Sequence, residues 1–181
     1  MLLSIALLAQ LAAMPALAQE ALTEAVAARR VQAAYLYRFA GYVQWPDAAL
    51  PQPDSPIHIG IWGDDALADD LAHLVAQRTV NGHRIKVRKI RDGDSFAGLQ
   101  ILYIGRERGA RMAEALSALP ARGTLVVTDS ASALQQGSAI NFLMVDGQVR
   151  FEASPQAAGG RGITLSSRLL AVSQNLSGQV R

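Results

Sequence analysis

The sequence predicts a single three-layer α/β domain with a mixed sheet, and three observations lead to this prediction. Between residues 57 and 137, short β-rich runs alternate with helix-forming segments, an order typical of parallel strands joined by helices. Asp146-Gly147, a strong hairpin signal, then joins two further β-rich runs and adds an antiparallel pair. The chain of 181 residues is long enough for one domain with a real core and too short for two comfortable ones.

Residues 1–18 differ in composition from the rest of the chain. They are almost wholly apolar and end in the small-residue pattern Ala16-Leu17-Ala18. This pattern predicts a secretory signal peptide that is cleaved before Gln19, which leaves residues 19–181 as the folded domain. The alternative is an uncleaved membrane anchor, for which the apolar run is marginal because a spanning helix needs about 20 apolar residues.

The first segment of the mature chain is predicted to be a helix over residues 23–43, since it lacks proline and is rich in good helix formers. At the helical repeat, one apolar arc is expected to face the core. The arc consists of Ala28, Val31, Tyr35, Leu36, Phe39, Tyr42 and Val43. Tyr37 falls outside it, and Trp45-Pro46 is expected to end the helix.

The remaining elements follow from the alternation of apolar runs and turn residues. Strands are predicted over residues 57–62, 84–90, 99–104 and 123–128. Helices are predicted over 65–77 and 107–119, with a short helix within 129–137. The C-terminal antiparallel hairpin is predicted to pair residues 139–145 with 148–153, and a closing helix is expected over 166–176.

The composition excludes several kinds of site. There is no cysteine, so the chain has no disulfide, thiolate metal site or cysteine nucleophile. The three histidines, His58, His73 and His83, do not stand at metal-ligand spacings. A net charge of +2 without a long basic run does not indicate nucleic-acid binding. Because no nucleophile, base and orienting group can be assembled from the motifs, we expect neither an enzyme nor a metal or cofactor site.

The most site-like segment is Gly60-Ile61-Trp62-Gly63-Asp64-Asp65. Gly63 and Asp64 follow one predicted strand and Asp129 follows another, and ligand sites in α/β sheets gather at such strand ends. These three residues are candidates for a ligand pocket. The alternative is structural, with Asp64 capping the next helix. A metal-assisted hydrolase using Asp64, Asp65 and Asp129 is a further alternative.

Several blocks of the sequence, in order and spacing, resemble the YfiR-like family of periplasmic proteins. These blocks are VQAAYLYRFAGYVQWP (31–46), IHIGIWGDDALADDLAHL (57–74), RTVNGHRIKVRKI (78–90), ILYIG, TLVVTD and GSAINFLMVDGQVRFEASPQAAGGRGITLSSRLL (137–170). The first is similar to the aromatic N-terminal helix of the family, which closes with Trp-Pro. The last is similar to its hairpin, its V-R-F-E strand and its closing helix.

The resemblance implies a periplasmic regulator with an α/β fold that usually forms a homodimer. It implies binding to the periplasmic sensor domain of an inner-membrane diguanylate cyclase, which the regulator represses, and an outer-membrane lipoprotein that can relieve the repression. Members of the family often carry cysteines, and because this chain has none, redox control through disulfides is not available to it. The alternative function is a periplasmic small-molecule sensor without a cyclase partner.

Tyr37, Arg38 and Trp45 are the candidates for contact with a protein partner. They are of the residue types that dominate the energetics of protein interfaces. The alternative is local: Tyr37 and Arg38 would form a solvated helix face, and Trp45 would close the helix end.

Overall fold

The computed structural model describes residues 3–174 of the chain, with side chains described from residue 18 onward. Its strands are β1 (Val43–Gln44), β2 (Ile57–Trp62), β3 (Thr79–Val80), β4 (His83–Ile90), β5 (Ile101–Ile104), β6 (Leu125–Thr128), β7 (Ile140–Val145), β8 (Gln148–Ala153) and β9 (Thr164–Leu165). Its helices are α1 (Leu3–Gly41), α2 (Asp65–Val75), α3 (Met112–Ala118), α4 (Pro155–Gly160) and α5 (Ser167–Val172), with 3-10 turns η1 (Asp47–Ala49) and η2 (Arg106–Arg111).

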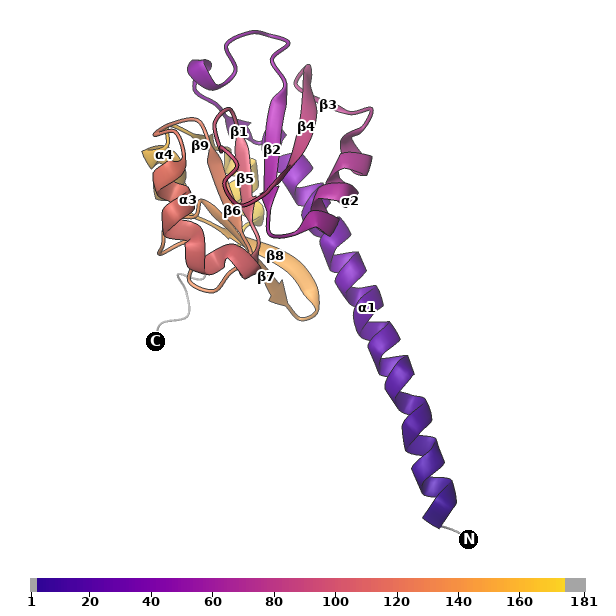
Figure 1. Ribbon diagram of the computed structural model, residues 1–181. Helices are drawn as coiled ribbons and strands as arrows, with labels where there is room; N and C mark the ends of the chain where they lie inside the picture. The colour runs from indigo at the N-terminus through magenta and orange to yellow at the C-terminus, as the bar shows by residue number, and fades with distance from the viewer. Residues whose placement is uncertain (1–2, 175–181) are drawn as a thin grey trace.

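The main sheet has the strand order β3-β4-β2-β5-β6-β7-β8 (Figure 1). The strands from β4 to β7 run parallel, and β3 and β8 add antiparallel strands at the two edges. The chain enters this sheet at β2, moves outward to β4 and then crosses back to β5. The direction of winding therefore reverses between β2 and β5, where sheets of this type usually bind ligands.

Helices cover both faces of the sheet and confirm the predicted three-layer α/β architecture. One face packs against α1 and α2 through a core that includes Ile59, Ile61 and Tyr103. The opposite face packs against α3 through a second core that includes Leu102 and Ile104. Because successive side chains of a strand point to opposite faces, the apolar run of β5 supplies both cores.

Aromatic side chains attach α1 to the β7–β8 hairpin. The Phe39 ring stacks on Phe142 at a centroid distance of 5.9 Å and meets Phe151 edge-on at 5.1 Å. Tyr35 lies 5.8 Å from Phe39 and 5.3 Å from Phe151. These stacked and edge-to-face arrangements are the favoured geometries of aromatic pairs. The predicted core positions Tyr35, Leu36 and Phe39 thus pack against the core, and Leu36 and Phe39 are fully buried.

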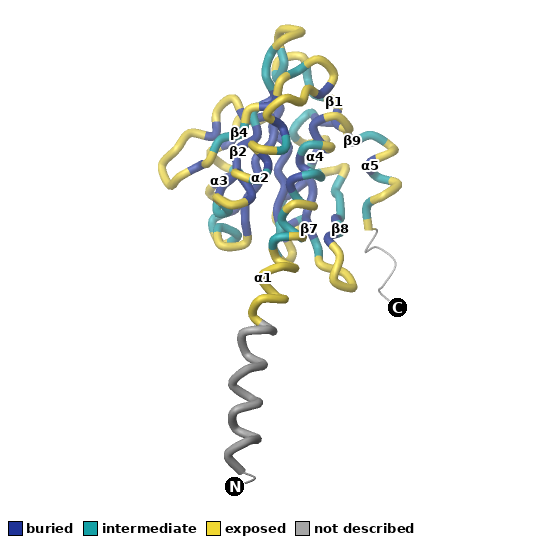
Figure 2. Tube along the Cα trace, turned by 90° about the vertical axis from the view of Figure 1, so that its right-hand side faces the viewer, coloured by how far each residue is buried: buried dark blue, intermediate teal, exposed yellow. Residues whose placement is uncertain are grey.

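Both predicted bounds of this helix were wrong: it begins at Leu3 rather than at residue 23, and its end differs by two residues. The helix α1 ends at Gly41, and Val43 instead begins β1, which pairs antiparallel with Leu165 of β9. Two predicted core residues are exposed: Tyr42, which follows the helix, is 38% accessible, and Val31 is 42% accessible. Val31 lies where α1 leaves the domain, and residues 18–25 are exposed throughout (Figure 2).

Other predicted helices also differ from the structure. The helix predicted over residues 107–119 begins as the 3-10 helix η2, and its α-helical part is limited to α3. Residues 129–137 form turns, because Ser132 and Gly137 have φ angles of 57° and 108° that a right-handed helix does not permit. The closing helix ends at Val172, and its predicted continuation to residue 176 lies partly outside the described residues. The hairpin turn is confirmed, with positive φ at both Asp146 and Gly147 as a type I′ turn requires.

The signal peptide and its cleavage before Gln19 stay a prediction, as do the domain bounds 19–181. Helix α1 projects from the domain at its N-terminal end (Figure 1). Among the described residues, no helix combines the length and apolarity that crossing a membrane requires.

Replacing Phe39 by Ala should lower the free energy of unfolding by about 3–5 kcal/mol, because it removes a buried ring and leaves a cavity between α1 and the hairpin. Chemical denaturation followed by circular dichroism measures this change. The matched control is Val172→Ala at a side chain that is 65% exposed, for which we expect a change within about 0.5 kcal/mol. Equal effects of the two substitutions would contradict the anchoring role of Phe39.

Candidate functional site

The loops that follow β2, β5 and β6 meet at the carboxyl ends of these parallel strands, which form the loop edge of the main sheet. Asp64 follows β2, Arg106 follows β5 and Asp129 follows β6, and all three line two adjoining clefts. The hairpin cleft, of about 780 Å³, lies between α1 and the β7–β8 hairpin. The edge cleft, of about 870 Å³, runs along the loops and is also lined by Gly63 and Tyr103. The structure thus places the predicted residues Gly63, Asp64 and Asp129 at the same edge.

Two glycines allow the loops after β2 and β5 to touch. Gly63 has a φ of +90°, a conformation that residues with a side chain rarely adopt. A Cβ atom at Gly105 would lie 2.8 Å from the backbone oxygen of Gly63, so a side chain there would push the loops apart. This close approach occurs where the winding of the sheet reverses, and it brings Asp64 and Arg106 to the same side of the edge cleft.

Asp64 has the structural role that the sequence allowed. Its Oδ1 atom accepts a hydrogen bond of 2.8 Å from the backbone N–H of Leu67, which caps the N-terminus of α2. Asp65 stands in the first turn of α2 and is exposed. Within the described part of the chain, no three His, Cys, Asp or Glu side chains are grouped closely enough to hold a metal ion. The alternative of a metal centre built from Asp64, Asp65 and Asp129 therefore finds no support in the geometry.

Asp129 is only partly satisfied by its neighbours. Its side chain is 12% exposed, and its Oδ2 atom accepts a 3.3 Å hydrogen bond from Nε of Arg106, whose side chain is 71% exposed. Its buried Oδ1 atom has no hydrogen-bond partner among the described residues, and neither does Oγ of Ser130. The backbone of this loop is held by Asn141, whose Oδ1 atom accepts from the N–H of Ser130 at 3.0 Å and from the Thr128 hydroxyl at 2.8 Å.

Tyr103 is the residue of this edge that sequence reasoning missed. It lies in β5 with no exposed surface, and its hydroxyl has no hydrogen-bond partner within residues 18–174. Burial raises the pKa of this hydroxyl, and the negative charges of Asp129 and Asp64 raise it further. In the sequence, Tyr103 is one member of the apolar run Ile-Leu-Tyr-Ile, so its pattern indicated only a buried strand.

Along the edge cleft, two guanidinium groups lie over the Trp62 ring. Those of Arg108 and Arg111 lie 5.7 and 4.9 Å from the ring centroid. Both arginines pair with Asp92, at 3.2 and 2.8 Å, and the indole N–H of Trp62 donates to the same carboxylate at 3.2 Å. Arg111 also pairs with Glu114 at 2.7 Å, so the two arginines are matched by two carboxylates. The cluster anchors the loops after β4 and β5 to the end of β2.

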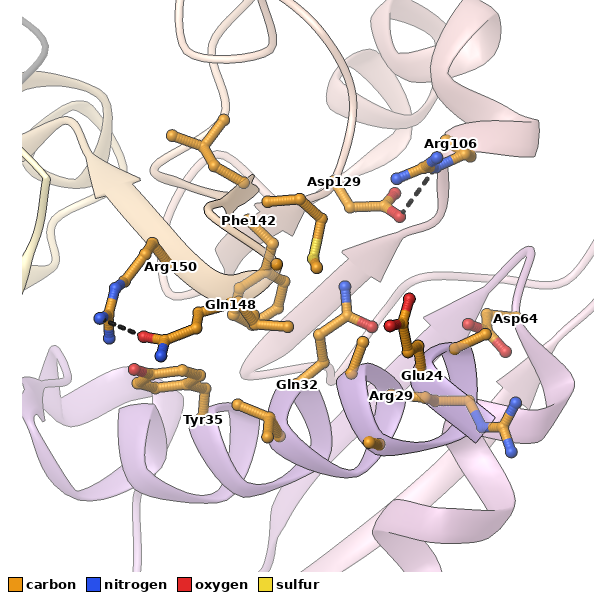
Figure 3. Close-up of a pocket in the computed structure, with 18 of the residues that line it drawn as sticks. Glu24, Arg29, Gln32, Tyr35, Asp64, Arg106, Asp129, Phe142, Gln148 and Arg150 are labelled. Atoms are coloured by element: carbon orange, nitrogen blue, oxygen red, sulfur yellow. Dashed lines mark hydrogen bonds and ion pairs between the residues drawn. The ribbon is translucent and has the colours of Figure 1, made fainter. Parts of the chain in front are cut away.

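The hairpin cleft combines aromatic side chains with polar ones (Figure 3). Tyr35 of α1 and Phe142 of β7 line one part of it. Glu24 and Gln32 extend from α1 toward the loops at the other part. The sequence did not single out Glu24 or Gln32, because their surroundings are supplied by segments that lie far away along the chain.

The three candidates for partner contact have different surroundings. Arg38 is exposed. Tyr37 is half-buried, donates a 3.4 Å hydrogen bond to the backbone oxygen of Thr79 and lies under the guanidinium of Arg78. Trp45 is also half-buried, and its indole N–H donates at 3.4 Å to the backbone oxygen at the end of α1, as the helix-closing alternative expected. Among the described residues, no hydrogen bond or aromatic pair joins these three side chains.

The chain is an α/β domain with helices on both faces of the sheet, and the edge cleft and the hairpin cleft lie where the winding of the sheet reverses. The family model described as YfiR/HmsC-like matches residues 29–174, and the chain therefore belongs to the YfiR/HmsC-like family. This family comprises periplasmic regulators of cyclic-di-GMP signalling rather than enzymes. No curated protein sequence matches the chain closely enough to count as a relative.

Replacing Asp64 by Ala should destabilise the protein by about 1 kcal/mol, because the N–H of Leu67 loses its acceptor at the start of α2. Asp64→Asn should lose only a small part of this, since an asparagine side chain caps helices about as well as aspartate. Thermal and chemical denaturation of the two variants provide the comparison. A larger loss for Asn than for Ala would show that the charge, and not the cap, is what stabilises α2.

The buried hydroxyl of Tyr103 should make the protein sensitive to alkali. Because its folded pKa is raised, the unfolded chain loses this proton near pH 10.0 while the folded chain keeps it. The protonated hydroxyl contributes fully to the free energy of unfolding below that pH. Above it, this free energy falls by about 1.4 kcal/mol per pH unit. Unfolding curves across this range should fall more steeply for the wild type than for Tyr103→Phe. Parallel curves would contradict the assignment.

Proposed function

We propose that this protein binds the periplasmic sensor domain of an inner-membrane diguanylate cyclase and represses cyclic-di-GMP synthesis. The observation that carries the proposal is the family match over residues 29–174, which begins within α1 and includes every strand from β1 to β9. The match thus concerns the whole described domain rather than one motif. Regulation in this family is the general function, and the cyclase partner is our inference from it.

Repression by such a domain has to work through binding alone. A regulator that binds the inactive state of the sensor domain more tightly than the active state shifts the equilibrium toward the inactive state. A shift from mostly active to mostly inactive requires a difference in affinity of about 10⁴-fold. The regulator therefore needs a contact surface that fits one state of the sensor domain and is lost in the other.

The exposed residues near the end of α1 support such a surface. Arg38 is exposed and is of a type enriched at interfaces, and Tyr42 beyond the helix end is 38% accessible. Tyr37 and Trp45 have less surface to offer, since both pack partly against the core. Of the three predicted contact residues, we therefore assign the main role to Arg38.

Two further parts of the proposal come from the family resemblance. One is that the regulator acts as a homodimer. The other is that an outer-membrane lipoprotein relieves repression by competing for the regulator. Size-exclusion chromatography with light scattering measures the first, and competition between a lipoprotein and the sensor domain for the regulator measures the second.

A small-molecule sensor is the second candidate function. It is favoured by the edge cleft of about 870 Å³, where a buried tyrosine hydroxyl and a buried carboxylate oxygen lack partners among the described residues. The two functions are compatible, because a ligand in the cleft could change the affinity for the cyclase.

Deleting the gene should raise intracellular cyclic-di-GMP, and the protein purified from the periplasm should capture an inner-membrane cyclase from membrane extract. Arg38→Glu should weaken this capture about tenfold or more, because a reversed charge at an interface is repelled where the original was attracted. Arg84→Glu is the charge-matched control at an exposed position of β4 and should capture normally. If Arg38→Glu captures the cyclase as well as the wild type does, the surface around Arg38 is excluded as the contact. Unchanged cyclic-di-GMP on deletion of the gene would contradict the proposed function.

A further inference from the structure

The edge cleft has unmet hydrogen-bonding capacity deep inside it. Oδ1 of Asp129 is a buried acceptor without a donor, and the hydroxyl of Tyr103, fully buried in the same cleft, is also unpaired within the described residues. Leaving a buried polar group without a partner costs about 1–3 kcal/mol, more if the group is charged. A second carboxylate, that of Asp64, lines the same space. The carboxylates can accept hydrogen bonds from a molecule that enters the cleft, and the Tyr103 hydroxyl beside Asp129 can donate or accept one.

The charges around the cleft favour a cation. Glu24 lines the adjoining hairpin cleft from α1 (Figure 3) and forms no ion pair with any described residue. Arg29, which also lines the hairpin cleft, is held away by a 2.8 Å ion pair with Asp70. The edge cleft itself is lined by the carboxylates of Asp64, Asp65, Asp92, Glu107 and Asp129 and by the guanidinium groups of Arg91, Arg106 and Arg108. Arg108 pairs with Asp92 and Arg106 with Asp129, and the acidic groups of the lining outnumber the basic ones.

Arg106 shows what kind of cation reaches Asp129. Its guanidinium Nε lies 3.3 Å from Oδ2 of Asp129, while most of the side chain remains in solvent. An exposed ion pair of this kind contributes little stability, so a competing cation can displace it. The protein's own guanidinium thus occupies one oxygen of the carboxylate, and the other, which is buried, has no donor among the described residues.

The spacing of the carboxylates decides between a metal ion and a larger cation. Among the described residues they are not grouped closely enough for one metal ion to be held by three of them. A guanidinium or ammonium group carries several N–H donors and can bond separated acceptors, so it does not need a tight ligand shell.

We propose that the edge cleft binds a positively charged nitrogen group, an ammonium or a guanidinium, which donates to Asp129 and faces Asp64 and the hydroxyl of Tyr103. The group has two sources, a small organic amine or an arginine or lysine side chain of a protein partner. The inference does not depend on the cyclase being that partner.

The test uses agmatine, which carries both kinds of cationic group, and the protein purified from the periplasm. Added agmatine should raise the thermal midpoint in a saturable manner beyond the effect of sodium chloride at equal ionic strength, since a ligand that binds only the folded state stabilises it. Asp129→Asn should weaken the apparent affinity about tenfold or more, because charge-assisted hydrogen bonds are lost. Arg106→Ala should tighten it, because the internal competitor is gone.

Two variants separate binding from folding. Asp54→Asn removes one carboxylate from an exposed loop outside both clefts and should respond to agmatine like the wild type. Tyr103→Phe keeps the ring in the core and removes only the unpaired hydroxyl, so it should fold normally and bind agmatine more weakly. Circular dichroism confirms that each variant is folded before its affinity is compared.

The source is identified by a second arm, in which wild type and Asp129→Asn capture the cyclase sensor domain. A saturable agmatine effect that Asp129→Asn removes supports a small amine. Loss of capture by folded Asp129→Asn, without any agmatine effect on the wild type, supports a partner side chain. If agmatine shifts the wild type and Asp129→Asn equally or not at all, and capture is also unchanged, the proposal is overturned. Failure of the wild type to capture the sensor domain would count against the proposed function, and the agmatine titration alone would then decide the inference: the absence of a shift that Asp129→Asn removes would overturn it.

Discussion

The packing of Phe39 and Tyr35 on Phe142 and Phe151 is the interaction on which the rest of the structure depends. It joins the N-terminal helix to the C-terminal hairpin and so closes the core on the face of the sheet that α1 and α2 share. The same contact sets the spacing between α1 and β7, and with it the width of the hairpin cleft. Among the described residues, α1 pairs its rings with those of the sheet only through Tyr35 and Phe39, so without this anchor Glu24 would no longer face the loops that carry the carboxylates.

The opposite end of the cleft depends on backbone geometry rather than on packing. Gly63 and Gly105 let two loops touch where the sheet changes direction, and the arginine–tryptophan cluster around Trp62 anchors their outer side. The clefts therefore have one wall built from apolar packing and another built from turns and ion pairs. Such a division suits a regulator, because the polar wall can exchange partners while the apolar wall maintains the fold.

The strands and the hairpin could be predicted because their signals are local, as in the period-two isoleucines of β2 and the Asp-Gly turn. The errors in the predicted secondary structure arose where segments far away along the chain determine the local conformation. Val43 fits the helical apolar pattern of the preceding segment but pairs with β9. Ser132 adopts a positive φ that no glycine or turn motif at that position indicates. At the candidate site, Asp64 and Asp129 could be found from their places after strands. Tyr103 and Glu24 could not be found from the sequence. Tyr103 belongs to an apolar strand pattern that indicates only core, and Glu24 lies in a helical segment where a charged side chain is expected to face solvent.

The pairing of β1 with β9 has a consequence for how the chain reaches this structure. It unites segments from nearly opposite ends of the domain, and such distant contacts are slow to form because a long loop of chain must first close. The parallel strands in between can associate earlier, but α1 finds its aromatic partners only after the hairpin exists. A nascent chain with this topology stays incompletely folded until almost all of it has been delivered. That delay leaves time for the polypeptide to be threaded across a membrane before it becomes too compact to pass.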